Sequence, residues 1–78
     1  MQKLLQEKCL GTNIRRLRKA AGLTQPQLVA KIQVAGGTIG DVTTLAKIEA
    51  GVGNIRVADL MALQSIFACD YSEFFRGL

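Results

Sequence analysis

Two cysteines are the strongest candidates for nucleophilic or zinc-binding chemistry among the side chains of this 78-residue chain. The chain has no histidine, so neither Cys9 nor Cys69 has the imidazole base that would activate a catalytic thiol. The two cysteines form no Cys-x-x-Cys pair, and a zinc site would need further ligands at short spacing. The sequence therefore predicts no enzyme, no metal and no other cofactor, with two reduced thiols favoured over a disulfide.

The chemistry that the sequence does favour is recognition of DNA, and it is concentrated in residues 24–51. Two short amphipathic segments lie there, joined by a connection that contains Gly36, Gly37 and Gly40. The second segment opens with polar, uncharged side chains. This layout is typical of a helix that enters the major groove of DNA.

The net charge of +4 adds a second indication, because it is unevenly placed. The first 20 residues hold one acid, Glu7, against six basic residues, which are Lys3, Lys8, Arg15, Arg16, Arg18 and Lys19. A basic patch on one element is typical of a phosphate-binding surface. The alternative is a basic helix face that is simply solvated.

Helices are the elements expected to position these residues. Apolar side chains recur at helical spacing and predict a first helix over about residues 10–21, ended by Gly22. These side chains are Leu10, Ile14, Leu17 and Ala21. Residues 1–9 could add a turn or two, because Leu4, Leu5 and Cys9 would extend the apolar stripe.

Two further helices are expected from their capping residues. Thr24 and Gln27 form a capping box for a helix over about residues 25–34, with Pro26 tolerated in its first turn. Asp41 is a good N-cap for the next helix, which is expected to end at Gly51. The expected inward positions of the two helices are Leu28, Val29, Ile32, Leu45 and Ile48.

The last third of the chain predicts two more helices. One covers about residues 57–68, and its expected buried face consists of Leu60, Met61, Leu63, Ile66 and Phe67. Asp70 and Glu73 repeat the capping-box spacing and open a short last helix with Phe74 and Phe75. The prediction is one all-α domain over residues 1–78, a compact five-helix bundle.

Three motifs at their spacings resemble a known family. They are I-R-x-L-R at residues 14–18, G-L-T-Q-x-x-L at 22–28 and I-E-x-G at 48–51. Together they resemble the helix-turn-helix domains of phage Cro and repressor type, the xenobiotic-response-element family, over about residues 10–75. The resemblance implies a lambda-repressor-like domain whose second and third helices form the helix-turn-helix. It also implies a homodimer on an inverted-repeat operator in double-stranded DNA.

The resemblance also assigns roles to individual residues. Val42, Thr43 and Lys47 match positions that reach base edges, and Lys47 lies one turn beyond Thr43 on the same face. The expected phosphate contacts are Gln25, Thr44, Asn54 and Arg56. For Gln25 the alternative is a solvated first turn, and for Asn54 a turn cap. Arg18 and Glu49 are expected to form a structural ion pair.

One departure from the family is the connection through residues 34–40, which is longer than in most relatives. We expect it to reach the DNA backbone or to alter the angle between the two helices. Val42, Ala50 and Gly53 also stand where relatives often carry arginine or another polar group, so weaker non-specific DNA binding is expected.

The resulting prediction is a cytoplasmic transcriptional regulator that acts by occupying its operator. No apolar run suits a membrane span or a signal peptide, and no small-molecule ligand is expected. The alternative is a protein-interaction module, antitoxin-like or antirepressor-like, with weak or no DNA binding. Phe74, Phe75 and Leu78 are expected either to pack across a dimer axis or to join the local core.

Overall fold

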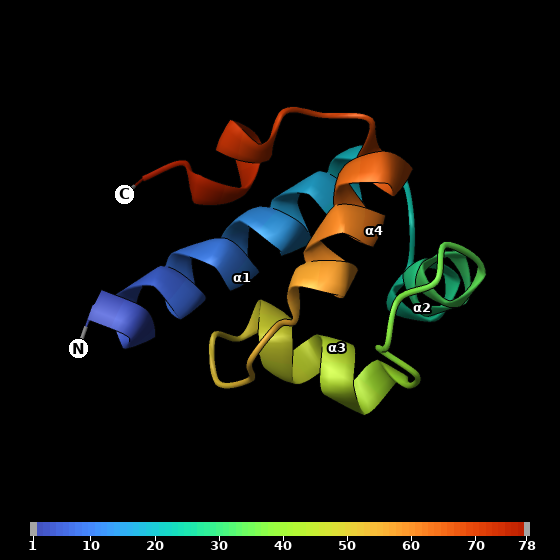
Figure 1. The fold of residues 1–78 in the computed structure, drawn as a ribbon, viewed down its shortest axis with the longest axis horizontal. Helices are drawn as coiled ribbons and strands as arrows, with labels where there is room; N and C mark the ends of the chain where they lie inside the picture. Colours follow the sequence, from blue (N-terminus) through green and yellow to red (C-terminus); the bar gives the residue numbers. More distant parts are fainter. Residues whose placement is uncertain (1, 78) are drawn as a thin grey trace.

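Four α-helices and one short 3-10 helix make up this computed structural model, which describes the backbone of residues 2–77 and the side chains of residues 9–77 (Figure 1). In chain order the elements are α1 (Gln2–Ala20), α2 (Gln25–Val34), α3 (Val42–Glu49), α4 (Val57–Phe67) and the 3-10 helix η1 (Tyr71–Phe75). No strand occurs among residues 2–77, so the all-helical prediction is confirmed. The expected fifth α-helix is instead the 3-10 helix.

The first helix begins earlier than its apolar stripe suggested. α1 starts at Gln2, so residues before Leu10 do extend it, although the side chains of Leu4 and Leu5 lie outside the described ones. Leu10 and Ile14 are buried, whereas Ala21 lies beyond the helix end and is exposed, contrary to its inward prediction. None of the helices in the described part is long and apolar enough to cross a membrane.

Gly11 marks the place where α1 crosses the end of α3. A Cβ atom at this position would lie 2.1 Å from the carbonyl oxygen of Ile48 and 2.9 Å from that of Glu49. Glycine inside a helix costs about 0.5–1 kcal/mol relative to alanine, so its presence here needs a reason. The close backbone approach provides that reason and sets the distance between α1 and α3.

Helices α2 and α3 start as their capping residues predicted. Thr24 Oγ1 accepts the backbone N–H of Gln27 at 3.3 Å, and Gln27 Oε1 accepts that of Thr24 at 2.9 Å. Asp41 Oδ1 accepts the backbone N–H of Thr44 at 2.7 Å. The predicted inward residues of both helices are buried, namely Leu28, Val29, Ile32, Leu45 and Ile48.

The buried face of α4 differs in part from the prediction. Leu63 is fully buried, and Leu60, Ile66 and Phe67 pack against the core, but Met61 is 57% exposed. Two residues outside the predicted face are also buried, Ala62 at 5% exposed and Asp59 at only 1%.

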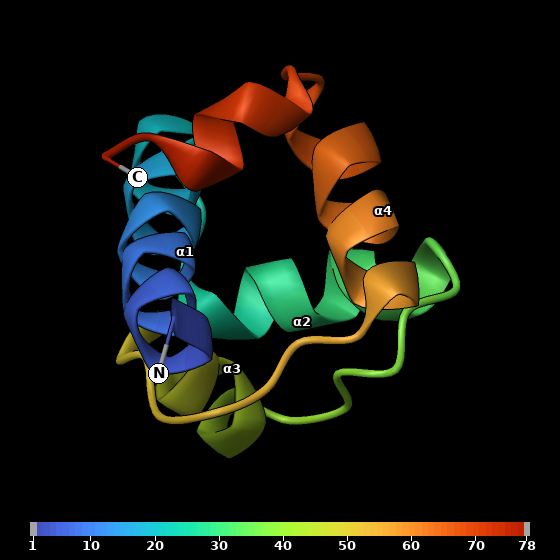
Figure 2. The ribbon, with the colours of Figure 1, turned by 60° about the vertical axis from the view of Figure 1, so that its left-hand side comes forward.

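The C-terminal segment folds back onto α1 (Figure 2). Phe74 is fully buried, with its ring 6.3 Å from that of Phe67, and Asn13 Nδ2 donates to the Phe74 carbonyl at 2.9 Å. Phe74 therefore belongs to the local core, while Phe75 is exposed and Leu78 lies outside the described residues.

The predicted capping box of this segment does not form. Asp70 makes no side-chain cap, and the Glu73 carboxylate instead pairs with Arg16 at 3.3 Å and Arg76 at 3.4 Å. A capping box satisfies free backbone N–H groups in the first turn of an α-helix, and a short 3-10 helix has fewer of these groups.

Candidate nucleic-acid interface

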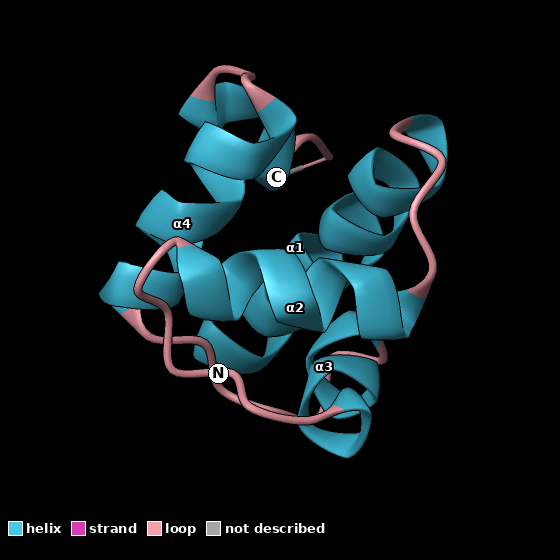
Figure 3. Cartoon of the chain, turned by 90° about the vertical axis from the view of Figure 1, so that its right-hand side faces the viewer, coloured by secondary structure: helices cyan, strands magenta, loops and turns pink. Residues whose placement is uncertain are grey.

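Helix α3 lies at one edge of the molecule, at the bottom of Figures 1 and 2 and the lower right of Figure 3. Leu45 and Ile48 are buried on its inner side. The three predicted base-contact residues are on the solvent side, where Val42 is 37% exposed and Thr43 and Lys47 are also exposed. The helix thus begins with an apolar side chain, Val42, rather than the expected polar one, and also presents a hydroxyl and an ammonium group to solvent.

The tip of α3 also carries a carboxylate. The Thr44 backbone N–H, and next the Thr44 side chain, hold the pKa of Asp41 below its usual value through hydrogen bonds. The carboxylate is therefore ionised at neutral pH and would repel a phosphate placed directly at the helix start. Thr44 is exposed, but its N–H is already used by the cap. A phosphate contact from Thr44 would have to come from its hydroxyl.

The expected ion pair between Arg18 and Glu49 is present and buried. Arg18 Nε donates to Glu49 Oε2 at 2.8 Å, and Arg18 Nη2 donates to Glu49 Oε1 at 3.2 Å, a bidentate arrangement. The two side chains are 10% and 4% exposed. Arg18 Nη1 also donates to the carbonyl of Leu23 at 2.9 Å. The pair therefore fastens the end of α3 to the end of α1.

Gln25 has a structural contact that the sequence did not suggest. Its Nε2 donates to Glu49 Oε1 at 3.1 Å, so its side chain links the start of α2 to the end of α3. The side chain is half-buried rather than fully solvated. Two groups of Gln25 are left to make the predicted phosphate contact. They are the second N–H of its side-chain amide and its backbone N–H at the start of α2.

Arg15 is a further candidate, which the sequence places in the basic patch of the first 20 residues but not among the expected phosphate contacts. A polar hollow of about 420 Å³ lies where α1, α2 and α3 meet. It is lined by Arg15, Arg18, Gln25, Ala46, Glu49 and Ala50. Arg15 is the exposed cation among them, next to the predicted phosphate contact Gln25. The sequence contained an indication of this place, because Arg15 lies three residues before Arg18 and therefore on the same helix face.

The basic patch predicted for the first 20 residues is smaller than its composition indicated. Arg16 pairs with Glu73 and donates to the Glu73 carbonyl at 3.0 Å, and Arg18 pairs with Glu49. Both cations therefore serve the fold. Arg15 and Lys19 are exposed, and the side chains of Lys3 and Lys8 fall outside the described ones.

The loop after α3 begins with a turn that is hydrogen-bonded to the Lys47 carbonyl near the helix end. The backbone N–H groups of Val52 and Gly53 both donate to the Lys47 carbonyl, at 3.0 and 3.2 Å. Asn54 and Arg56 follow and are exposed, and Arg56 is the N-cap residue of α4 without a side-chain cap. The Arg56 guanidinium thus extends from a backbone position that α4 fixes.

Comparison with protein-family models, with curated proteins and with solved structures found no match to this chain. The geometry is therefore the basis for assigning a function. Within the described part of the chain, no group of three or more histidine, cysteine, aspartate or glutamate residues could hold a metal ion. Cys9 and Cys69 are free thiols, and burial raises the pKa of Cys69.

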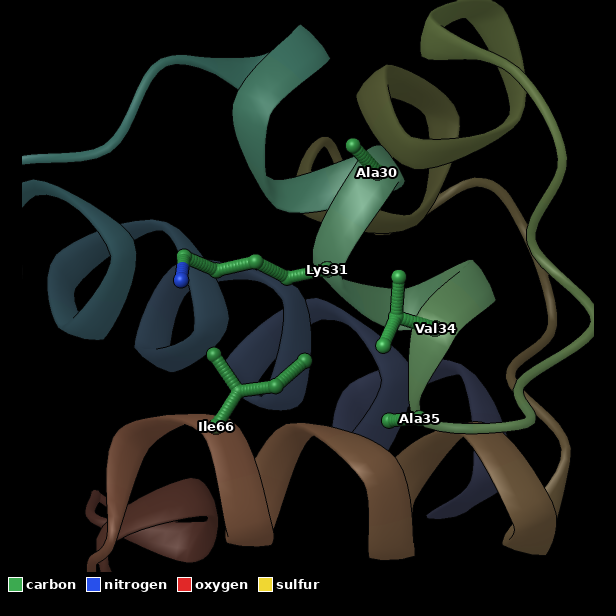
Figure 4. A pocket seen from close by; sticks show the side chains of 5 residues that line it. All are labelled: Ala30, Lys31, Val34, Ala35 and Ile66. Atoms are coloured by element: carbon green, nitrogen blue, oxygen red, sulfur yellow. The ribbon is translucent and has the colours of Figure 1, made fainter.

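A second surface feature lies between α2 and α4, away from the polar hollow that Arg15 and Gln25 line (Figure 4). It is an apolar groove of about 410 Å³, lined by Ala30, Lys31, Val34, Ala35 and Ile66. Val34 is 90% exposed, and the exposed Met61 on α4 lines a neighbouring hollow that shares Ala35 with the groove. Exposed apolar side chains grouped in this way are typical of a protein-binding surface.

Proposed function

We propose that this chain is a sequence-specific regulator that binds double-stranded DNA, a single-domain protein of the Cro and repressor type. In this proposal α2 and α3 form a helix-turn-helix, and α3 enters the major groove. The observation that carries it is the two-sided nature of α3, whose inner face is core while Val42, Thr43 and Lys47 face solvent. Regulation would follow from occupying the operator.

The chemistry of these three side chains supports direct reading of bases. The Lys47 ammonium can donate to guanine N7 and O6, and the methyl groups of Val42 and Thr43 can contact that of thymine. Base reading needs a helix held in one position. The contacts that Glu49 accepts from Arg18 and Gln25 hold the end of α3 to its neighbours in that way.

Backbone contacts in the proposal come from the residues around α3. Gln25, Thr44, Asn54 and Arg56 keep their predicted phosphate-binding roles, and Arg15 joins them because it shares the hollow with Gln25. Phosphate contacts set affinity and register, whereas base contacts set specificity. A homodimer would place two copies of α3 about 34–36 Å apart on an inverted repeat.

Selection of binders from a randomised pool of duplex DNA at physiological salt tests this function. We expect enrichment of an inverted repeat with half-sites about one helical turn apart. The affinity for the selected site should fall steeply with salt, with a slope of about 0.9 per phosphate contacted. A folded protein that enriches no sequence, and whose DNA affinity ignores salt, would contradict the proposal.

Two single substitutions should separate base reading from phosphate binding. Lys47→Ala is expected to cost about 1–3 kcal/mol at the base pair it reads and to relax the preference there. Arg56→Ala should weaken binding to all sequences alike and reduce the salt slope by about one. Affinities for the selected site, for its single-base variants and for unrelated DNA measure both effects.

Lys31→Ala is the matched control for these variants, because it removes a lysine from the groove between α2 and α4 rather than from α3. We expect little change in its preference among bases. Equal losses at all sites for Lys47→Ala and Arg56→Ala would contradict the division of roles.

The apolar groove supports a second candidate, a protein-interaction module that is antitoxin-like or antirepressor-like. Its lining has one charged side chain, Lys31, and the neighbouring Val34 is almost fully exposed. Such a module would bind DNA weakly or not at all. The same selection and salt titration distinguish it from the first candidate, because its salt slope should be near zero.

A further inference from the structure

Asp59 is a buried carboxylate that holds the long connection between α2 and α3. It lies in the first turn of α4 and is 1% exposed. Its Oδ1 accepts the backbone N–H groups of Thr38 and Ile39, the latter at 3.2 Å. Its Oδ2 accepts the Thr38 hydroxyl at 2.5 Å. The helix start also favours a negative charge at this place.

Further contacts hold the same connection on both sides of Asp59. Gly37 N donates to the Ile32 carbonyl at 2.9 Å, and Gln33 Nε2 donates to the Gly40 carbonyl at 3.3 Å. Ile39 is buried in the core. A Cβ atom at Gly37 would lie 2.6 Å from Asp59 Oδ1, so the backbone and the carboxylate are in close contact.

This anchoring bears directly on the start of α3. Ile39 is followed by Gly40, by the N-cap Asp41 and then by Val42, the first residue of the helix. Fixing Thr38 and Ile39 therefore fixes where α3 begins. The far end of α3 is held separately by the bonds that Glu49 accepts. The helix is thus fastened at both ends to different parts of the fold.

We propose that Asp59 is a positioning residue for base recognition, acting through residues 38–39 on the tip of α3 without touching DNA. The inference rests on the proposed function. Base contacts depend on the placement of donor atoms to within about 0.5 Å, whereas phosphate attraction tolerates small shifts. Loss of the carboxylate should therefore reduce discrimination between sequences more than it reduces binding to DNA in general.

The test compares four variants at a temperature where each is folded by circular dichroism. Asp59→Ala removes all three acceptor contacts, and Thr38→Val removes only the hydroxyl contact, which is the milder change if Asp59→Ala unfolds. Asp59→Asn keeps an oxygen for the two N–H groups and an amide that can donate to the Thr38 hydroxyl. Asp70→Ala removes an exposed acid whose side chain caps nothing.

The readouts are two. The first is the ratio of affinities for the selected operator and for an unrelated duplex. We expect Asp59→Ala to lower this ratio about tenfold or more, the equivalent of one good base contact. We expect Thr38→Val to lower it less, and Asp59→Asn and Asp70→Ala to leave it nearly unchanged. The second is hydrogen exchange at the amides of residues 38–44, which should speed up in Asp59→Ala.

Equal loss of affinity for both duplexes in Asp59→Ala, with the ratio unchanged, would overturn the positioning role and leave a structural one. If Asp59→Ala does not fold, equal loss of affinity for both duplexes in Thr38→Val would overturn the positioning role instead. Wild-type protein that selects no sequence would instead overturn the proposed function. The two failures are therefore distinguishable, because the first requires a wild-type protein that discriminates normally.

Discussion

Glu49→Ala is expected to lower the free energy of unfolding by about 3–5 kcal/mol, because it leaves a buried guanidinium without its carboxylate. The Arg18 side chain is 10% exposed, and two of its N–H groups donate to Glu49 at 2.8 and 3.2 Å. Its remaining contact, with the Leu23 carbonyl, does not balance the charge. Gln25 loses its partner in the same variant.

The total stability of a domain of this size is about 4–12 kcal/mol, so such a loss brings the variant close to unfolding. Arg18→Ala should have a comparable effect, since it strands the Glu49 carboxylate. The double variant Arg18→Met with Glu49→Leu should cost less than either single change, because neither charge is then buried. Gln25 is half-buried and can turn its amide towards water.

Urea unfolding of the wild type, the two single variants and the double variant measures these differences. A double variant that is less stable than either single variant would contradict the expectation, because it would show that the cost does not come from leaving one charge buried without its partner. Lys19→Ala is a suitable control, since it removes an exposed cation from the same helix. Its stability should remain within about 0.5 kcal/mol of the wild type.

Local features of this fold could be predicted from the sequence because their partners are close along the chain. The capping box of Thr24 and Gln27 spans three residues, and so does the bond from Thr44 N to Asp41. The predicted range of α2 equals the observed Gln25–Val34. In such cases the side chain and the backbone group that it serves are within one helical turn.

The face of α4 could not be predicted in the same way. Val57–Phe67 contains apolar side chains on most of its circumference, so periodicity does not select an inner side. Met61 was predicted to be buried and is exposed, while Asp59 is buried. The partners of Asp59 are 20 and 21 residues away, in a connection without periodic pattern. Only the folded chain brings them together.

The candidate interface contains features formed by residues close along the chain and features formed by distant residues. The solvent side of α3 follows from the spacing of Thr43 and Lys47 within one helix. The polar hollow needs three helices to meet, so the contact of Gln25 with Glu49 and the place of Arg15 were not available from spacing. The ion pair of Arg18 and Glu49 was expected only through the family resemblance, because 31 residues separate its members.

Phe74 and Phe75 are adjacent in sequence but should behave very differently when replaced. Phe74→Ala is expected to lower the free energy of unfolding by about 3–5 kcal/mol, because it removes a fully buried ring and leaves a cavity. The ring contacts with Phe67 and Tyr71 are lost with it. Phe75→Ala should change the stability of the monomer by no more than about 0.5 kcal/mol, because this side chain is exposed.

Thermal unfolding at low protein concentration and sedimentation at high concentration separate the two roles. If two copies pair through the C-terminal segment, Phe75→Ala should shift the sedimenting species towards monomer while leaving the fold intact. A dimer that persists in Phe75→Ala would place the two-fold contact on another surface, and an unaltered stability in Phe74→Ala would contradict its place in the core. Because both substitutions remove the same atoms from neighbouring positions, the comparison isolates the effect of burial from that of side-chain type.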